Sequence, residues 1–251
     1  MKPKVLVLRT AGTNCDGETA HAFTLAGATP QFVHVNRLLE RPGQLHDYQI
    51  LAVPGGFSYG DDIAAGRILA NQIMNRLRDE LHAFVAAGKP VIGVCNGFQV
   101  LVKTDLLPGV IGGRTGQTAT LAHNASGRFI DRWVHLAPRG ERCIWTRGLE
   151  PLELPIAHGE GRFVPADDAV RRALHDGGHV ALVYDNGSNP NGSVDDIAGV
   201  CDATGLVFGL MPHPERYVNP TQHYAWTSQH PRPTVGAGLR VFENAVRHAA
   251  G

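Results

Sequence analysis

The segment 89–101, KPVIGVCNGFQVL, most constrains the fold of this chain, because a buried strand there turns directly into a helix. Residues 91–94 form a short apolar run rich in β-branched side chains, which is typical of a buried parallel strand. Gly93 and Gly97 omit the two Cβ atoms that would crowd a sharp turn at Cys95. The pattern therefore predicts an α/β sheet with Cys95 at the carboxyl end of one strand.

Cys95 is placed where a nucleophile is useful. Residues 98–102 are mostly apolar and can continue as a helix, so the sulfur lies near a helix N-terminus whose partial positive charge favours the thiolate. A free thiol has a pKa near ~8.5 and is mostly protonated at neutral pH, so the positive end of the helix is needed to raise the thiolate fraction. A small apolar cysteine that only fills space at a strand end is the alternative, and the glycine spacing alone leaves it open.

The segment 209–216, GLMPHPER, supplies a base and an orienting carboxylate, which a thiol nucleophile needs. Its two prolines hold the residues before them in extended conformations. Because side chains alternate with a period of two, His213 and Glu215 then project to the same side. We expect Glu215 to hold one ring nitrogen of His213 while the other faces the sulfur. A surface turn with an exposed histidine and a solvated glutamate is the alternative.

A second histidine, His158 in AHGEGRF, competes with His213 for the role of base, because Glu160 stands two residues after it. The spacing does not separate the two pairs. Only the pair at 213 and 215 has prolines that impose an extended geometry.

The remaining cysteines are weaker candidates. Cys15 lies in a glycine-flanked loop before a helix that begins near Glu18, and no base stands at a readable spacing from it. Cys143 and Cys201 have less support still. The four cysteines show neither a CxxC pair nor the spacing of zinc ligands, so we expect no metal site. The chain opens with charged residues and a strand instead of an apolar signal segment, which indicates a reducing, cytoplasmic location.

Composition limits the classes of partner. The chain has 251 residues, 43% hydrophobic and 18% charged, enough for one substantial core in a single domain spanning 1–251. Lys plus Arg and Asp plus Glu are both 23, so the basic excess of a nucleic-acid-binding protein is missing. No run approaches the ~20 apolar residues of a membrane helix. We expect neither nucleic acid nor membrane as a partner.

Alternating strand and helix patterns predict a flavodoxin-like α/β domain. It has a central, mostly parallel sheet with helices on both faces and additional β structure in the second half. A helical stripe covers 64–86, and a final helix covers 238–249. Strands are expected at 4–9, 31–35, 49–53 and 90–94, then near 129–136, 154–157, 180–184 and 205–210.

Six sequence blocks carry a resemblance to a known family. GVCNGFQ around Cys95 and the downstream MPHPER resemble the class I glutamine amidotransferases, which use a Cys, His, Glu triad in that order. RTAGTNCDGET, VPGGFSYGDDIAAG, PIAHGEGRF and NPNGSVDDIAGVCD resemble one branch, the glutaminase subunits of phosphoribosylformylglycinamidine synthase. The blocks extend from Arg9 to Arg216, nearly the whole chain.

The resemblance implies hydrolysis of glutamine to glutamate and ammonia. Cys95 would attack the side-chain amide, His213 would take the thiol proton and protonate the leaving ammonia, and Glu215 would fix the tautomer of His213. Six further positions of this chain match family residues that supply backbone N–H donors to an oxyanion hole or form the walls of a glutamine pocket. They are Gly56, Asn96, Gln99, Gly55, His158 and Gly159.

The resemblance also implies partners. The ammonia would pass to a large synthetase subunit in the fourth step of de novo purine synthesis, with a small accessory subunit in the complex. The chain has no GxxxxGK[ST] phosphate loop, so ATP and Mg²⁺ are expected on the synthetase and no cofactor on this chain. The isolated subunit is expected to be nearly inactive until it is assembled.

Two other functions remain open. One is a different cysteine hydrolase of the same fold, such as a γ-glutamyl hydrolase or peptidase, and the other is a noncatalytic flavodoxin-like binding module. The segment 217–236 is longer than the family's usual connection, and it is rich in proline, histidine and aromatic residues. It is read as a loop over the active-site mouth, a synthetase contact, or an excursion packed on its own surface.

Overall fold

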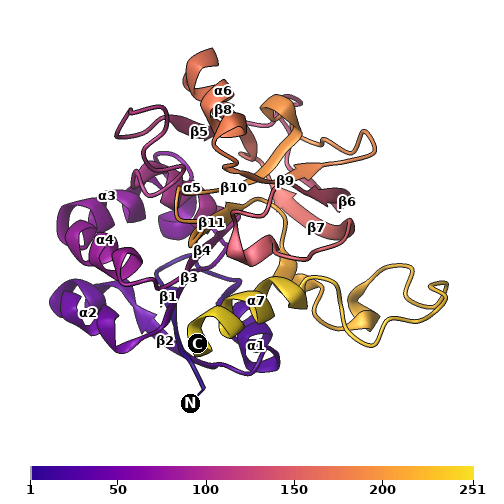
Figure 1. Cartoon of the computed structure of the whole chain (residues 1–251), viewed down its shortest axis with the longest axis horizontal. Helices are drawn as coiled ribbons and strands as arrows, with labels where there is room; N and C mark the ends of the chain where they lie inside the picture. The colour runs from indigo at the N-terminus through magenta and orange to yellow at the C-terminus, as the bar shows by residue number, and fades with distance from the viewer. Residues whose placement is uncertain (1) are drawn as a thin grey trace.

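A nine-stranded sheet runs through the molecule in the computed structural model, which describes residues 2–251. Its strand order is β2-β1-β3-β4-β11-β10-β9-β6-β7, and the pair β5-β8 forms a separate small sheet (Figure 1). The parallel strands are β1 (Lys4–Arg9), β2 (Thr29–His34), β3 (Ile50–Val53), β4 (Val91–Val94) and β11 (Val207–Leu210). The antiparallel extension consists of β10 (Ile197–Cys201), β9 (Val180–Tyr184), β6 (Ile130–Pro138) and β7 (Leu152–His158). β5 is Ala119–Ala122 and β8 is Arg162–Pro165.

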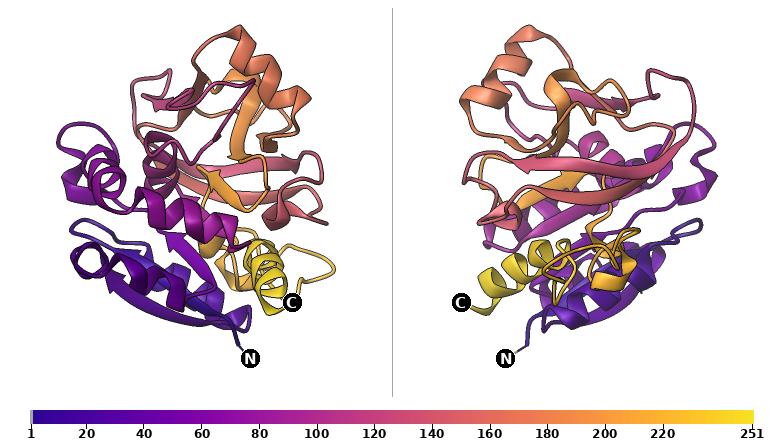
Figure 2. Two further views of the ribbon diagram at one scale, coloured as in Figure 1. Left: turned by 60° about the vertical axis from the view of Figure 1, so that its left-hand side comes forward. Right: turned by 90° about the vertical axis from the view of Figure 1, so that its right-hand side faces the viewer.

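Helices cover both faces of the parallel half. They are α1 (Asp16–Leu25), α2 (Val35–Glu40), α3 (Arg67–Arg76), α4 (Arg78–Ala86), α5 (Asn96–Lys103) and α7 (Leu239–Ala250). The helix α6 (Asp168–Asp176) lies instead against β8 of the small sheet. Six short 3₁₀ turns are η1 (Pro42–Asp47), η2 (Ser58–Asp61), η3 (Ile144–Thr146), η4 (Val194–Asp196), η5 (Pro214–Arg216) and η6 (Pro220–Gln222). The rings of Phe23 and Phe242 meet edge to face at 5.0 Å and join α1 to α7. Figure 2 shows α1 and α7 on one face and α3 and α5 on the other. The predicted α/β fold, with extra β structure in the second half, is confirmed.

The strand-to-helix turn at Cys95 has the predicted form. Cys95 has φ 51° and ψ −108°, a backbone conformation that L residues rarely adopt. A Cβ on Gly93 would lie 2.6 Å from the Gly97 carbonyl oxygen, and a Cβ on Gly97 would lie 1.8 Å from the carbonyl oxygen of Val53. The helix α5 can therefore approach β3 and β4 only because both residues are glycine.

Replacing Gly97 with alanine is expected to destabilise the fold by about 3 kcal/mol or more, because backbone atoms must move to admit the new methyl group. Urea denaturation measures the change in free energy of unfolding. The matched control is Gly43→Ala, since a Cβ on Gly43 meets no atom within 4 Å. Equal stability of the two variants would contradict the tight approach.

The expected single helical stripe over 64–86 was wrong in one respect. Leu77 has φ −126° and ψ 0°, so the helix breaks there into α3 and α4. Ile73, Leu77 and Leu81 are all buried, so the apolar face continues across the break. Hydrophobic spacing predicted which residues are buried but did not predict this change of direction.

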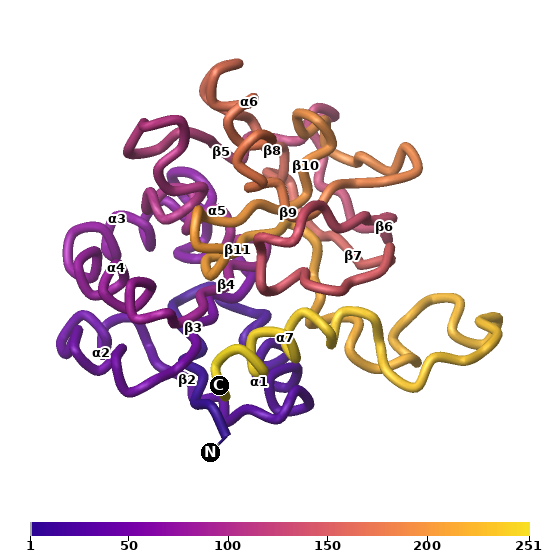
Figure 3. The backbone as a smooth tube through the Cα atoms, in the orientation of Figure 1, coloured from indigo at the N-terminus to yellow at the C-terminus, as the bar shows by residue number. Residues whose placement is uncertain are grey.

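The segment 217–236 projects from the domain beside α7 and β7 (Figures 1 and 3). Its base is held by aromatic packing, with Trp133 edge to face against Tyr217 at 5.3 Å and against His223 at 4.6 Å. The buried His223 also contacts the carboxylate of Glu153 at 3.2 Å. The start of the segment is therefore anchored on β6 and β7, and its distal part extends away from the core.

Candidate active site

Cys95 opens onto a cavity of about 260 Å³ at the carboxyl ends of the parallel strands. The thiol is buried, with 6% of the residue exposed. Of the residues predicted from the sequence, five line this cavity: Gly56, Cys95, Gln99, His158 and Gly159. Gly55, Asn96, His213 and Glu215 are not on its wall.

His213 and Glu215 form a buried pair. The Nδ1 atom of His213 donates to Oε1 of Glu215 at 2.7 Å, and their side chains are 2% and 0% exposed. Cys95 and Cys15 both lie close to this imidazole, on either side of Gly55. The Nε2 atom of His213 makes no hydrogen bond among the described residues. Burial lowers the pKa of His213, but the Glu215 carboxylate and the two cysteines outweigh it and hold that pKa well above its usual value.

The predicted extended conformation of residues 213–215 was wrong. Pro214 begins the 3₁₀ turn η5, so Glu215 lies in a helical turn and not in a straight strand. Proline suits the first position of such a turn because its missing N–H would have no partner there. The turn brings the carboxylate back to the imidazole, and the predicted contact forms by this different backbone route.

Gly55 and Gly56 follow β3 and lie beside the thiol. A Cβ on Gly55 would lie 3.0 Å from Cε1 of His213 and 3.4 Å from Cβ of Cys95, so these side chains converge on this glycine. Gly56 has φ 138°, and a Cβ there would lie 2.6 Å from the Gly12 carbonyl oxygen. Within residues 2–251 its N–H donates to no acceptor. Only glycine fits at position 56, next to the cavity.

A polar network joins the loop after β3 to α5. The side chain of Asn96 accepts from the Ser58 N–H at 3.2 Å and donates to Oδ1 of Asp61 at 3.1 Å. It also donates at 3.0 Å to Gln99, whose Nε2 donates to the Glu160 carbonyl oxygen at 2.5 Å. The network holds Asp61 and Gln99, which both line the cavity.

Sequence reasoning did not select Asp61 as a site residue, although it lies in the block VPGGFSYGDDIAAG. Its carboxylate lines the cavity, and burial raises its pKa. The Glu160 carboxyl group lies in the same wall, 3.7 Å from a ring nitrogen of His123. Acidic residues in a glycine-rich loop most often face solvent, so only the fold shows that these carboxylates face the cavity.

His158 lies near His213 but in a different environment. Its Nδ1 donates to the side-chain oxygen of Asn124 at 3.1 Å, and no contact joins it to the Glu160 carboxylate among the described residues. Burial, with the nearby charge of His213, lowers the pKa of His158 to about 4. The structure thus gives a carboxylate partner to His213 and an amide partner to His158.

Comparison with known proteins decides the family. Residues 2–249 match the family of CobB/CobQ-like glutamine amidotransferase domains. The chain belongs to this glutamine amidotransferase family.

Among the relatives of this amidotransferase, phosphoribosylformylglycinamidine synthase subunit PurQ of Dehalococcoides mccartyi is 44% identical, covering 99% of this chain and 98% of that protein. The subunit PurQ of Treponema denticola is 48% identical, covering 87% of this chain and 89% of that protein. A chain in the solved structure of PurLQS from Thermotoga maritima superposes with a TM-score of 0.77 and 33% identity, covering 98% of this chain and 99% of that chain. The amidotransferase is therefore of the PurQ type.

No base stands at a readable spacing from Cys15 along the chain, but the fold brings one close to it. Its sulfur, one ring nitrogen of His213 and one carboxylate oxygen of Glu215 all lie within 4.8 Å of one another. The guanidinium of Arg216 donates to the sulfur at 3.3 Å. Spacing along the chain could not show this, because Cys15 follows β1 and His213 follows β11. Of the four thiols, only that of Cys95 lines the cavity.

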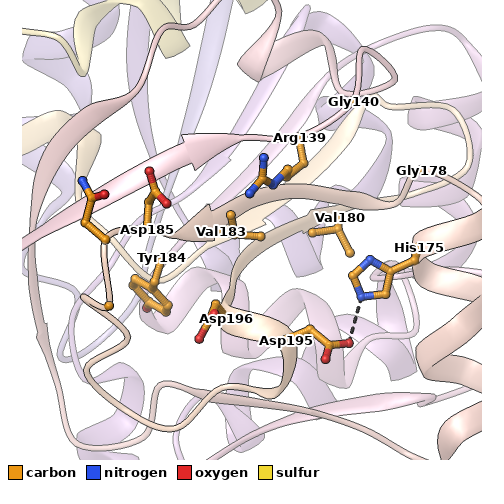
Figure 4. Close-up of a pocket in the computed structure, with 12 residues that line it drawn as sticks. Arg139, Gly140, His175, Gly178, Val180, Val183, Tyr184, Asp185, Asp195 and Asp196 are labelled. Carbon is orange, nitrogen blue, oxygen red and sulfur yellow. Dashed lines mark hydrogen bonds and ion pairs between the residues drawn. The ribbon is translucent and has the colours of Figure 1, made fainter.

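A separate cavity of about 460 Å³ lies between β9, α6 and the η4 turn, and none of the predicted site residues lines it. Figure 4 shows its wall, where a ring nitrogen of His175 contacts the Asp195 carboxylate at 2.8 Å. The guanidinium of Arg171 holds the same carboxylate at 2.7 Å. The Asp195 carboxylate in this cavity is therefore already paired with side chains of the same chain.

No helix among residues 2–251 combines the length and apolar content needed to cross a membrane.

The burial of neutral His158 predicts a pH dependence of stability. Its pKa of about 4 in the folded chain lies below the value near ~6.5 of an unfolded histidine. Between these values the unfolded chain binds the extra proton, so stability is full above about pH 6.5 and falls by on the order of 3 kcal/mol toward pH 4. Urea denaturation of His158→Gln across this range is expected to lack that component.

The control for this pH series is His21→Gln, since His21 is exposed on α1. It is expected to keep the full pH dependence of the unmodified chain. A His158→Gln variant with an unchanged pH dependence would contradict the assignment of a neutral, buried His158.

Proposed function

We propose that this chain hydrolyses glutamine to glutamate and ammonia and delivers the ammonia to a synthetase subunit. That subunit converts phosphoribosylformylglycinamide to phosphoribosylformylglycinamidine with ATP. The observation that carries the proposal is the buried His213–Glu215 pair set against Cys95, the one thiol on the wall of the 260 Å³ cavity. The names of the PurQ relatives support the same reaction.

In the first step His213 takes the proton of the Cys95 thiol, and the sulfur attacks the side-chain amide carbon of glutamine. The raised pKa of His213 favours the imidazolium in this exchange. The Glu215 carboxylate stabilises the imidazolium and fixes its Nδ1–H. The same imidazolium then donates its proton to the departing ammonia, and water hydrolyses the resulting thioester.

The negative charge on the amide oxygen needs hydrogen-bond donors. The free N–H of Gly56 lies at the cavity, and the N–H of Asn96 opens α5, so we assign both as the oxyanion hole. Each such donor is typically worth ~3 kcal/mol in the transition state. Gly55 leaves space for the sulfur and imidazole, while Gln99, His158 and Gly159 border the substrate. These roles come from position and from the family pattern.

The partners follow from the relatives. We assign a large synthetase subunit that holds ATP and Mg²⁺ and a small accessory subunit to the complex, with residues 1–251 acting as one amidotransferase domain. PurLQS of Thermotoga maritima, whose name joins three components, supports this assembly. No cofactor is assigned to this chain. The four cysteines are free thiols, which suits a reducing cytoplasm.

Ammonia release from glutamine, measured with and without a purified synthetase partner, tests the proposal. We expect weak release alone and strong stimulation by the complete complex with its substrate and ATP. Hydrolysis of γ-glutamyl peptides in place of free glutamine would instead favour a γ-glutamyl hydrolase. No reaction in either setting would favour a noncatalytic module.

A further inference from the structure

Asn124 makes four hydrogen bonds to the turn of residues 158–161, which forms part of the cavity wall. Its backbone N–H donates to the Gly159 carbonyl oxygen at 2.9 Å. Its side-chain Nδ2 donates to the His158 carbonyl oxygen at 2.8 Å. Its Oδ1 accepts from the Gly161 N–H and from Nδ1 of His158, both at 3.1 Å. This one asparagine, only 3% exposed, therefore holds the whole turn.

These contacts fix the orientation of the Asn124 amide and, through it, the tautomer of His158. A backbone N–H can only donate, so the Gly161 N–H identifies the amide oxygen. The carbonyl oxygens of His158 and Arg128, each 2.8 Å from Nδ2, identify the amide nitrogen in the same way. Since the amide oxygen faces the ring, Nδ1 of His158 must carry the proton. Burial lowers the pKa of His158 to about 4, so the ring is neutral at pH 7 and Nε2 carries the lone pair.

A second buried asparagine holds the same turn from the block NPNGSVDDIAGVCD, which the proposed hydrolysis leaves without a role. Nδ2 of Asn191 donates to the Gly161 carbonyl oxygen at 2.9 Å, and Asn191 is 0% exposed. Its Oδ1 accepts from the N–H and the hydroxyl of Ser193 at 3.0 and 2.7 Å. That hydroxyl accepts from the Phe163 N–H at 3.0 Å. Both polar backbone groups of Gly161 are thus held by asparagine side chains.

The His158 ring packs directly on the backbone that the two asparagines hold. A Cβ on Gly161 would lie 2.2 to 2.6 Å from three atoms of that ring, so only glycine fits there. A shift of Gly161 would therefore move the imidazole. His158 lines the same cavity as Cys95, whereas neither asparagine reaches the cavity wall.

We propose that Asn124 and Asn191 are positioning residues of the glutamine site. They hold residues 158–161 in the arrangement that receives the substrate, and Asn124 fixes His158 as the neutral Nδ1–H tautomer. Without these hydrogen bonds the turn would be ordered only when glutamine binds, and the cost of ordering would weaken binding. The effect on glutamine rests on the proposed function, whereas the tautomer is independent of it.

Nitrogen-15 NMR of the full-length chain, labelled at its histidine nitrogens, tests the tautomer. The signals of residue 158 are identified by their loss in His158→Gln. In the unmodified chain at pH 7 we expect a protonated Nδ1 and a bare Nε2. In Asn124→Ala the Nδ1–H loses its acceptor, so the Nε2–H tautomer should appear. An Nε2–H ring in the unmodified chain, or an unchanged tautomer in folded Asn124→Ala, would overturn the assignment.

Steady-state kinetics of glutamine hydrolysis by the assembled complex tests the positioning. Asn124→Ala and Asn191→Ala are each expected to raise KM at least ~10-fold, a typical effect of losing buried hydrogen bonds. The value of kcat should change less than ~3-fold, because the proposed triad is untouched. This division between KM and kcat separates positioning of the substrate wall from damage to the triad.

The matched control is Asn244→Ala, the same change at another buried asparagine. Nδ2 of Asn244 donates to the carbonyl oxygens of Trp145 and Arg147 at 3.1 and 2.8 Å, away from the cavity. This variant should keep both kinetic constants of the unmodified complex.

Thermal melting first establishes that each variant is folded, and either asparagine of the pair can decide the test alone. An unchanged KM in the folded variants would overturn the positioning role. An equal rise of KM in Asn244→Ala would overturn it too, because loss of stability would then explain the effect. A complex that releases no ammonia under any condition would refute the proposed function, and the NMR result would still decide the tautomer.

Discussion

Cys95→Ser is expected to reduce glutamine hydrolysis by ~10⁴-fold or more, because loss of a nucleophile removes the whole covalent route. A serine hydroxyl in the same place is a far poorer nucleophile beside this imidazole, whose raised pKa is set by the Glu215 carboxylate and the cysteines. The measurement is ammonia release by the assembled complex at saturating glutamine. Synthesis from added ammonium should survive in this variant, since the partner performs that step.

The matched control is Cys143→Ser, the same atomic change at a buried thiol away from the cavity. It is expected to retain glutamine hydrolysis if it remains folded, which thermal melting determines. A Cys95→Ser complex that still hydrolyses glutamine at the rate of the unmodified complex would exclude Cys95 as the nucleophile.

Single substitutions at the two neighbouring histidines are expected to have different kinetic effects. His213→Asn should lower kcat by ~10³-fold or more, because it removes the base and the acid that protonates ammonia. His158→Asn should mainly raise KM, since His158 lines the cavity and is paired with the Asn124 side chain. Steady-state kinetics of glutamine hydrolysis in the complex separates the two effects.

The two histidines should differ because only His213 is paired with a carboxylate. Glu215 Oε1 lies 2.7 Å from His213, whereas the Nδ1 of His158 has only a neutral amide oxygen as partner. The pKa of His213 is correspondingly raised, and that of His158 is lowered to about 4. A reversed pattern, with kcat lost at position 158 and KM raised at position 213, would transfer the role of base to His158.

The parts of the fold that local chemistry determines could be predicted from the sequence. The glycines at 93 and 97 predicted the turn at Cys95, because each Cβ would meet backbone at 2.6 Å or less. The contact between His213 and Glu215 was predicted from residues only two positions apart. In both cases the predicted feature spans only a few residues, although the close approach at Gly97 also involves the distant Val53 carbonyl oxygen.

Features set by distant packing could not be predicted. The strands β5 and β8 are four residues each and pair only with one another, so neither carries a strong local signal. The apolar strand β10 pairs with both β9 and β11. Its residues were recognised only as part of the block NPNGSVDDIAGVCD, and no strand was predicted there. The helix break at Leu77 and the contact of Cys15 with His213 likewise follow from tertiary packing.

Covalent labelling with a glutamine analogue that carries an electrophilic diazoketone tests the central assignment most directly. After digestion, mass spectrometry identifies which of the four cysteines carries the adduct. The account predicts one adduct, on Cys95, and its loss when glutamine protects the cavity or when His213 is replaced by asparagine. Adduct on Cys15 with Cys95 unmodified would contradict the account.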